Sequence, residues 1–124
     1  MTKSKQRGTK AETDIRNYLR SRFWPYARRL TLAGAKDPGD VTLGDGIHVT
    51  VEVKDCATYR LSEWLTEAHK ERDNNGHRVG FVWFKRRGKG SPRDWFVLMD
   101  GDTVTHLLHR AGYSMPDQAT EVAA

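Results

Sequence analysis

Residues 48–54, His-Val-Thr-Val-Glu-Val-Lys, constrain the fold most strongly, because valines alternate with polar residues along them. This period of two predicts a β-strand with the valines on one face and Thr50, Glu52 and Lys54 on the other. Residues 38–43 precede this strand and are joined to it through Gly-Asp-Gly, a sequence typical of a tight hairpin turn. The two segments therefore predict a pair of short antiparallel strands.

The expected register of this hairpin brings two carboxylates to one face. We expect Leu43 to face Ile47 across the turn. In that register Asp40 lies opposite Thr50 and diagonal to Glu52, with roughly 7–8 Å between the diagonal Cα atoms. Two carboxylates at that separation can bind one divalent ion together, and the lysine of the second strand stands one step further along the same face.

A pair of carboxylates beside a lysine suits the metal-assisted hydrolysis of a phosphodiester. Mg²⁺ prefers carboxylate oxygens and takes substrate phosphates beside one or two carboxylates. The ion polarises the phosphoryl oxygen and lowers the pKa of a bound water, and a lysine ammonium can orient that water or offset the developing charge. The pattern therefore predicts Mg²⁺ as the cofactor, with Mn²⁺ as a substitute.

The same residues carry a family resemblance. Asp40 followed by the Glu-Val-Lys of residues 52–54 resembles the signature of the PD-(D/E)xK nuclease superfamily. The glycine-bearing helix start over residues 8–12 is similar to that of the archaeal-type Holliday-junction resolvases within this superfamily. Over residues 8–113 the chain also resembles the small resolvase-like endonucleases of actinobacterial phages.

This resemblance implies a restriction-endonuclease-like core and a metal-dependent DNA endonuclease. It implies cleavage of branched double-stranded DNA by a homodimer, because two symmetric nicks across a four-way junction need two sites. Asp40 and Glu52 would hold the metal, with the Val53 carbonyl as a further ligand. Lys54 would support the attacking water, and Glu12 would assist at the metal from the first helix.

Two of these assignments have alternatives. Gly39 separates the proline from the aspartate that are adjacent in the family pattern, so Asp37 is a rival of Asp40 for the metal. Glu12 lies three residues after Thr9, a spacing typical of a helix capping box. Glu12 therefore caps the first helix, reaches the metal, or does both.

Composition sets the class of protein and of partner. The chain has 124 residues and a formal charge of +5, which predicts one domain and favours a polyanionic partner. It contains no apolar run of the length needed to span a bilayer, so we expect no membrane partner. The lone Cys56 cannot form an internal disulfide, so we expect a small packing residue and a cytoplasmic location, in the host cell if the chain is phage-encoded.

Periodicity and turn residues predict an α/β domain in which a mixed central sheet is flanked by helices, in the order αβββαββα. We expect a flexible basic arm over residues 1–9, a nuclease domain over 10–113 and a flexible tail over 114–124. The helices are expected over residues 10–23, 61–74 and 102–110, and the strands over residues 26–32, 38–43, 48–54, 79–84 and 94–99.

Basic residues near the predicted site are candidates for DNA contacts. The loop over residues 85–93 is punctuated by glycine and proline and is suited to gripping a sugar–phosphate backbone without reading sequence. The candidate DNA-binding residues are Lys10, Arg28, Arg29, Lys36, Lys85, Arg86, Arg87, Lys89 and Arg93.

Charge patterning on the second predicted helix adds a further signal. Glu63, Glu67 and Glu71 form two like-charged pairs at i,i+4, each of which destabilises an isolated helix by a few tenths of a kcal/mol. This conflict indicates that some of these carboxylates face a partner or a basic neighbour.

Other functions compatible with the sequence differ in substrate or in chemistry. A nuclease of the same fold with flap, single-strand or restriction-like specificity would cut linear DNA as well as junctions. A non-catalytic DNA-binding module would keep the fold and the charge but cut nothing.

Overall fold

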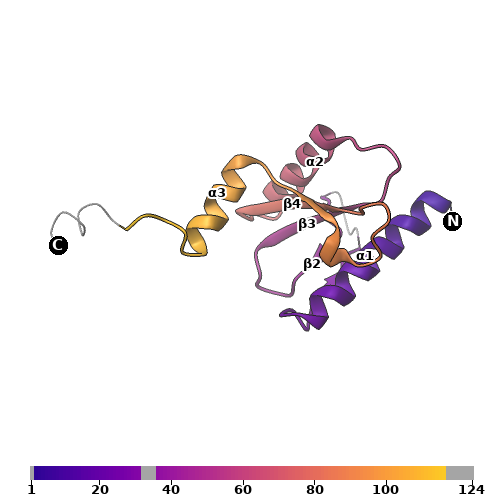
Figure 1. The fold of residues 1–124 in the computed structure, drawn as a ribbon, viewed down its shortest axis with the longest axis horizontal. Coiled ribbons are helices and arrows are strands. Elements are labelled where there is room, and N and C mark those ends of the chain that lie inside the picture. The colour runs from indigo at the N-terminus through magenta and orange to yellow at the C-terminus, as the bar shows by residue number, and fades with distance from the viewer. Residues whose placement is uncertain (1, 32–35, 117–124) are drawn as a thin grey trace.

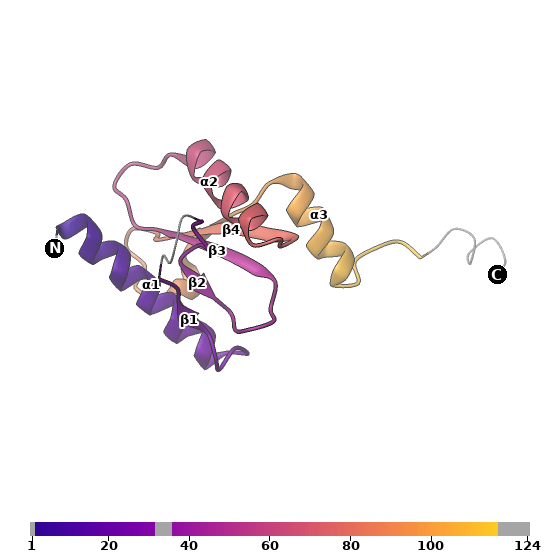
Figure 2. The same ribbon diagram turned by 180° about the vertical axis from the view of Figure 1, so that it is seen from behind.

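The computed structural model describes residues 2–31 and 36–116, and it shows one α/β domain with a mixed five-stranded sheet and three α-helices (Figures 1 and 2). The α/β class predicted from the sequence is confirmed. In chain order the elements are α1 (Lys3–Ser21), β1 (Arg28–Arg29), β2 (Val41–Thr42), β3 (Val49–Lys54), α2 (Leu61–Asn74), β4 (Val79–Phe84), a 3₁₀ turn (Pro92–Asp94), β5 (Phe96–Leu98) and α3 (Gly101–Arg110).

The sheet has the strand order β1-β2-β3-β4-β5, with β3 at its centre. The pairs β1–β2, β2–β3 and β4–β5 are antiparallel, whereas β3 and β4 are parallel and are connected through α2. Parallel neighbours need such a crossover connection. As a result the carboxyl ends of β3 and β4 lie side by side at one edge of the domain.

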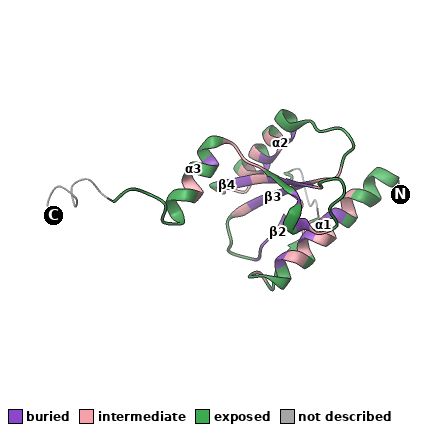
Figure 3. Cartoon of the chain, viewed as in Figure 1, coloured by how far each residue is buried: buried purple, intermediate pink, exposed green. Residues whose placement is uncertain are grey.

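Two helices cover the two faces of the sheet, so β3 is buried on both sides (Figure 3). On one face, Ile15 and Leu19 of α1 share a core with Val51 and Val53. On the other face α2 packs over the polar side of β3, which is buried as well. The polar side chains of β3 therefore face a helix and not bulk solvent.

The first helix begins earlier than the sequence pattern indicates. Thr2 caps it by accepting a hydrogen bond from the Lys5 N–H (3.2 Å), and residues 3–9 are helical. The prediction that this helix begins at residue 10 is therefore wrong, and residues 3–9 of the predicted arm are helical. Lysine, glutamine and arginine are good helix formers, and they extend the helix without an apolar stripe of their own.

The hairpin between β2 and β3 has a different register from the one predicted. Val41 pairs with Val51, so Asp40 does not lie opposite Thr50. The connection is longer than a tight turn, and Leu43 is buried in the core at its start. The shift amounts to two residues, which keeps each side chain on its predicted face.

The other elements lie close to their predicted positions. α2 and β4 have the predicted bounds, and α3 begins one residue early. The strands predicted over residues 26–32, 38–43 and 94–99 are shorter. β1 pairs with β2 only over Arg28–Arg29, Gly39 before β2 adopts a positive φ of 93°, and residues 92–94 form a 3₁₀ turn before β5. Residue 32 of the first strand and residues 117–124 of the predicted tail lie outside the described residues.

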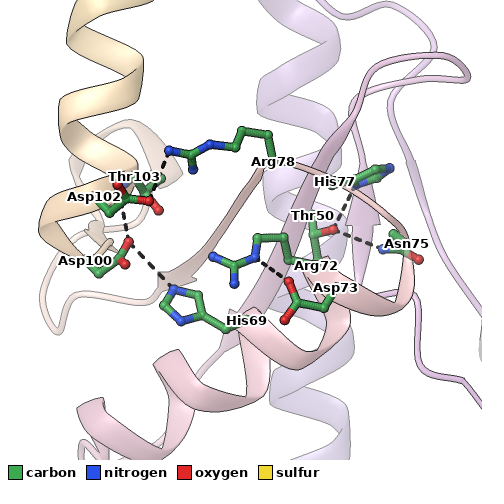
Figure 4. Close-up of polar contacts among 10 residues, drawn as sticks. All are labelled: Thr50, His69, Arg72, Asp73, Asn75, His77, Arg78, Asp100, Asp102 and Thr103. Atoms are coloured by element: carbon green, nitrogen blue, oxygen red, sulfur yellow. Dashed lines mark hydrogen bonds and ion pairs between the residues drawn. The ribbon is translucent and has the colours of Figure 1, made fainter.

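Polar contacts join α3 and its N-cap residue to α2 and to the residue before β4 (Figure 4). The Asp102 carboxylate lies 3.0 Å from the Arg78 guanidinium, and the Asp100 carboxylate lies 3.7 Å from the His69 ring. Within the described part of the chain, no helix has the length and apolar character needed to cross a membrane.

Candidate metal centre

Four carboxylates gather between α2 and β3. Asp37, Glu52, Glu67 and Glu71 each offer an oxygen atom, and these atoms lie within 4.8 Å of one another. The residues come from the segment before β2, from β3 and from α2. We call this group the acidic cluster.

The close approach of α2 to the sheet brings two of its glutamates to β3. Glu67 and Glu71 lie one turn apart on the same helix face. At Gly80 of β4, a Cβ atom would come within 2.7 Å of the Arg72 Cβ and 3.3 Å of the Ala68 carbonyl oxygen. Glycine at this position therefore lets the helix backbone pack directly on the sheet and carry its carboxylates inward.

Two members of the acidic cluster are buried without partners. Glu52 is 4% exposed and Glu71 is 1% exposed. Within the described residues, no donor reaches Glu52 Oε2 or either carboxylate oxygen of Glu71. An unpaired buried charge is costly, so these two carboxylates need either protons or a cation.

The pKa values of both residues reflect this environment. Burial, hydrogen-bond contacts with Asp40 and Glu71, and the charges of those two residues hold the pKa of Glu52 far above its usual range. Burial raises the pKa of Glu71 to about 7; the neighbouring Glu52 carboxyl, which can donate only when it is protonated, opposes this shift, and the charges of Asp37 and Glu67 add to it. Without a cation, the pair therefore retains protons that a carboxylate normally loses near pH 4.

Asp37 and Asp40, the two rival ligands, occupy different places. Asp37 belongs to the acidic cluster, and its Oδ1 accepts a hydrogen bond from the Gly39 N–H (2.9 Å). Asp40 lies beside Glu52, and its Oδ2 accepts a hydrogen bond from the Val53 N–H (2.8 Å). The structure therefore brings both aspartates to Glu52 and fixes Asp40 on the backbone of β3.

Gly39 makes this arrangement of the two aspartates possible. Its φ of +93° favours glycine, and a Cβ atom there would lie 3.1 Å from the Val51 carbonyl oxygen. The glycine that interrupts the family pattern is thus the residue that allows the chain to turn tightly against β3.

Lys54 forms an ion pair across the cluster. Its Nζ lies 2.8 Å from the Glu67 carboxylate. Burial acts to lower the pKa of Lys54, but the hydrogen bond with Glu67 and the charges of Glu52, Glu67 and Asp40 raise it overall. The lysine is therefore a cation, held against α2 at the rim of the acidic cluster.

Glu12 approaches the site from α1, outside the group of four carboxylates. It pairs with Arg29 at 3.4 Å. Burial and the negative charge of Asp40 raise the pKa of Glu12, and Arg29 opposes this shift. Because α1 starts at Lys3, the alternative that Glu12 caps the helix is wrong, and its position near Asp40 remains as the basis for a role at the site.

The candidate DNA-binding residues fall into two groups. Lys10, Arg28 and Arg29 are paired with Asp14, Asp45 and Glu12, at 2.9, 2.8 and 3.4 Å. After β4 the cations stand over aromatic rings: the Lys85 ammonium lies 5.8 Å from the Trp95 ring and the Arg86 guanidinium 5.2 Å from the Phe96 ring. In the same loop Arg87, Lys89 and Arg93 are exposed. Lys36 belongs to neither group and is exposed in the segment before β2. The loop after β4 thus presents a cationic surface, while the first group is already neutralised by ion pairs.

Glu67 and Glu71 are absent from the site residues predicted from the sequence. Their signal was the like-charged i,i+4 pair, which indicated a basic neighbour or a partner without identifying it. The structure supplies Lys54 as the neighbour of Glu67 and the buried Glu52 as that of Glu71.

The donor set of the acidic cluster fits a hard divalent cation. All four groups are carboxylates, the ligands preferred by Mg²⁺, Mn²⁺ and Ca²⁺, and three buried oxygens lack donors among the described residues. Such a cation would supply the charge that these oxygens lack. The same chemistry does not distinguish Mg²⁺ from the other two ions.

Comparisons with known proteins do not assign a family. No family model matches this chain, and no solved structure matches it. A stretch of 67 residues, 53% of the chain, is 34% identical to Beta-glucosidase 44 of Arabidopsis thaliana. The match spans only 12% of that relative's length, so it gives no basis for assigning the activity in its name.

Proposed function

We propose that this protein is a divalent-metal-dependent endonuclease that cleaves branched DNA by phosphodiester hydrolysis. The observation that carries the proposal is the pair of buried carboxylates, Glu52 and Glu71, whose oxygens lack donors among the described residues while Lys54 stands at the rim. Buried ionisable groups with shifted pKa values are characteristic of functional sites.

In this proposal the metal is held by Glu52 and by one or both of Asp37 and Asp40, with Glu71 as a further ligand and the Val53 carbonyl as another candidate. A divalent cation at such a site lowers the pKa of a bound water and polarises the phosphoryl oxygen. The residues around the metal have separate roles. Asp40 is oriented by the Val53 N–H, which holds its Oδ2, and its carboxylate lies beside Glu52.

Lys54 would act on the substrate and not on the metal. Its ammonium is paired with Glu67 in the structure, and the flexible four-carbon stem allows it to exchange this partner for a phosphate oxygen or an attacking water. Offsetting charge that develops in the transition state is worth about 10²–10³ in rate for a single well-placed donor.

The sheet topology supports the same function by analogy. The chain has a helix, three antiparallel strands, a second helix and the parallel strand β4. This order is compatible with the core that the family resemblance implies. Fold alone does not determine function, so the acidic cluster carries the argument. The specificity for junctions and the homodimer belong to the proposal through the family resemblance.

The test is cleavage of a labelled four-way junction beside a linear duplex of the same sequence, in Mg²⁺ or in EDTA. We expect paired nicks in the junction with wild-type protein in Mg²⁺, and none in EDTA. Glu52→Gln should abolish the nicks. Glu63→Gln is the matched control, because Glu63 is an exposed carboxylate of α2 outside the acidic cluster.

The other outcomes separate the alternatives. Equal cutting of junction and duplex would keep the nuclease and reject the junction specificity. Tight binding of DNA without cutting in Mg²⁺ or Mn²⁺ would reject the enzyme and favour a non-catalytic DNA-binding module.

A further inference from the structure

A cavity lies outside the acidic cluster, at the carboxyl ends of the two parallel strands. It has a volume of about 220 Å³, and its lining includes Arg7 of α1, Asp55, Cys56 and the two basic residues Lys85 and Arg87. None of these residues belongs to the acidic cluster.

The position of this cavity follows from the topology. β3 ends at Lys54 and β4 ends at Phe84, and the Lys85 N–H donates a hydrogen bond to the Lys54 carbonyl oxygen (2.9 Å). The chain diverges from here into the connection to α2 and into the loop after β4. In α/β sheets, ligands bind preferentially in the crevice outside the carboxyl ends of parallel strands.

The N-terminal half of α1 closes one side of this crevice. In both ribbon views this end of α1 lies on the same side of the molecule as the connection between β3 and α2 (Figures 1 and 2). Arg7 reaches the cavity because residues 3–9 are helical. A basic segment with no apolar stripe is therefore ordered beside the site.

The lining of the cavity carries an excess of positive charge. Three cations, Arg7, Lys85 and Arg87, face one carboxylate, Asp55. Within residues 2–31 and 36–116, none of these four side chains forms an ion pair. Arg7 contacts the Ser4 hydroxyl at 3.4 Å, and Lys85 lies over the Trp95 ring. Unpaired cations around a concave site attract an anion.

We infer that this cavity is a phosphate-binding subsite that receives a backbone phosphate of the DNA, next to the phosphate that is cut. The identification of the anion as DNA rests on the proposed function. Arginine binds phosphate through two parallel N–H donors, and the cavity begins one residue beyond Lys54. The cavity also opens onto the loop over residues 85–93, whose other cations would contact the next phosphates of the same DNA strand.

Cys56 provides a direct readout of occupancy. It is the single cysteine of the sequence and lines the cavity. It is exposed, so the prediction of a packing residue is wrong. Its rate of modification by N-ethylmaleimide, an uncharged reagent, would be measured by mass spectrometry, with EDTA present throughout to prevent cleavage. The four samples would contain no ligand, junction DNA, inorganic phosphate, or chloride at equal ionic strength.

We expect saturating DNA to slow the modification at least tenfold and millimolar phosphate to slow it in proportion to its occupancy, with no effect of chloride. Arg87→Ala and Arg7→Ala should remove most of the protection by phosphate. Each should also reduce the slope of log K against log salt for DNA binding by about 1, the value for one lost phosphate contact. Arg110→Ala removes the same charge from the exposed end of α3 and should change neither quantity.

Failure of this inference differs from failure of the proposed function. If the protein cuts junctions but Cys56 reacts at the same rate with and without bound DNA, the phosphate subsite is rejected and the nuclease stands. If inorganic phosphate protects Cys56 and bound DNA does not, the ligand is a small phosphate compound and the assignment to backbone phosphate is overturned. If no metal supports cleavage while DNA and phosphate both protect Cys56 and Arg87→Ala abolishes this, the subsite stands without the nuclease.

Discussion

Glu52 in β3 and Glu71 in α2 each place a carboxylate oxygen within 4.8 Å of the other, in a site where both residues are buried. Two carboxylates this close in a buried site cannot both be charged without a cation, because desolvation and mutual repulsion act in the same direction. The pair therefore couples the stability of the domain to protons and to metal ions.

Divalent cations should stabilise the wild-type protein against unfolding. A cation that binds only the folded state at 100 times its Kd adds about 2.7 kcal/mol to the free energy of unfolding. We expect Mg²⁺ or Mn²⁺ to raise the melting temperature of the wild type relative to EDTA by several degrees. Glu71→Gln should lose most of this increase, because it removes one ligand from the acidic cluster.

The control for this measurement is Glu63→Gln, which removes an exposed carboxylate from the same helix. It should keep the full effect of the cation. An equal rise of the melting temperature in Glu71→Gln and in the wild type would show that Glu71 is not a ligand.

The stability of the metal-free protein should fall as the pH rises from about 5 to about 7. Burial raises the pKa of Glu71 to about 7 from its ordinary value of 4.5. Between these values the folded state holds a proton that the unfolded state has lost, so the free energy of unfolding decreases with pH by up to about 1.4 kcal/mol per pH unit. Below about pH 4.5 this contribution is fully present, and above about pH 7 it is lost.

Chemical unfolding in EDTA across this pH range tests the expectation. Glu71→Gln mimics the protonated carboxyl and should flatten the dependence between pH 5 and pH 7. A wild-type stability that rises with pH over this range would contradict the raised pKa of Glu71.

Much of the fold was predictable because the periodic segments are strong. α2 and β4 have bounds that match the prediction, since a polar segment with a glycine end precedes a nearly continuous apolar run. The start of α1 was not predictable from apolar spacing, because residues 3–9 form helix from intrinsic propensity and the Thr2 cap alone. The lengths of short strands such as β1 were overestimated, because pairing with a neighbouring strand, and not composition, decides where a strand ends.

The candidate site was predictable only in part. Glu52 and Lys54 alternate along β3, and Asp40 directly precedes β2, its antiparallel neighbour, so the sequence could place them together. Glu67 and Glu71 reach β3 through the packing of α2, which depends on Gly80 and is a tertiary property. The i,i+4 spacing of these two like charges indicated that a neighbouring group exists, but it did not identify the residue.

Replacing Lys54 should separate catalysis from metal binding. Lys54→Ala removes the ammonium that pairs with Glu67, and we expect the cleavage rate to fall by about 10²–10³. The affinity for Mg²⁺, measured by calorimetry, should stay equal or increase, because a competing cation leaves the acidic cluster. A loss of Mg²⁺ affinity in Lys54→Ala equal to that in Glu52→Gln would assign the lysine a structural role instead.

Glu12 should matter more for activity than for stability. Its pair with Arg29 is long, at 3.4 Å, and only partly buried, so Glu12→Gln should change the free energy of unfolding by no more than about 1 kcal/mol. If its position near Asp40 serves the metal, cleavage should fall at least tenfold. Asp14→Asn, which breaks the Lys10 pair on the same helix, is the matched control and should leave cleavage unchanged. Wild-type cleavage by Glu12→Gln would remove Glu12 from the site.

Asn75 should support the acidic cluster from outside it. Its Nδ2 donates to the Pro38 carbonyl oxygen (2.9 Å) and to Thr50 Oγ1 (3.0 Å), which is itself 2.9 Å from His77 Nδ1. Asn75→Ala leaves these acceptors without their donor, so we expect a loss of about 1–3 kcal/mol in the free energy of unfolding.

Asn75 holds the Pro38 carbonyl oxygen by a hydrogen bond, and Pro38 lies in the chain between the two aspartates that approach Glu52. Asn75→Ala should therefore also weaken Mg²⁺ binding. A tenfold loss of affinity corresponds to about 1.4 kcal/mol. Asn74→Ala is the control, because Asn74 is the neighbouring amide at the end of α2 and forms no side-chain hydrogen bond with the described residues. Wild-type Mg²⁺ affinity in a destabilised Asn75→Ala protein would show that Asn75 holds the fold without positioning Asp37 and Asp40.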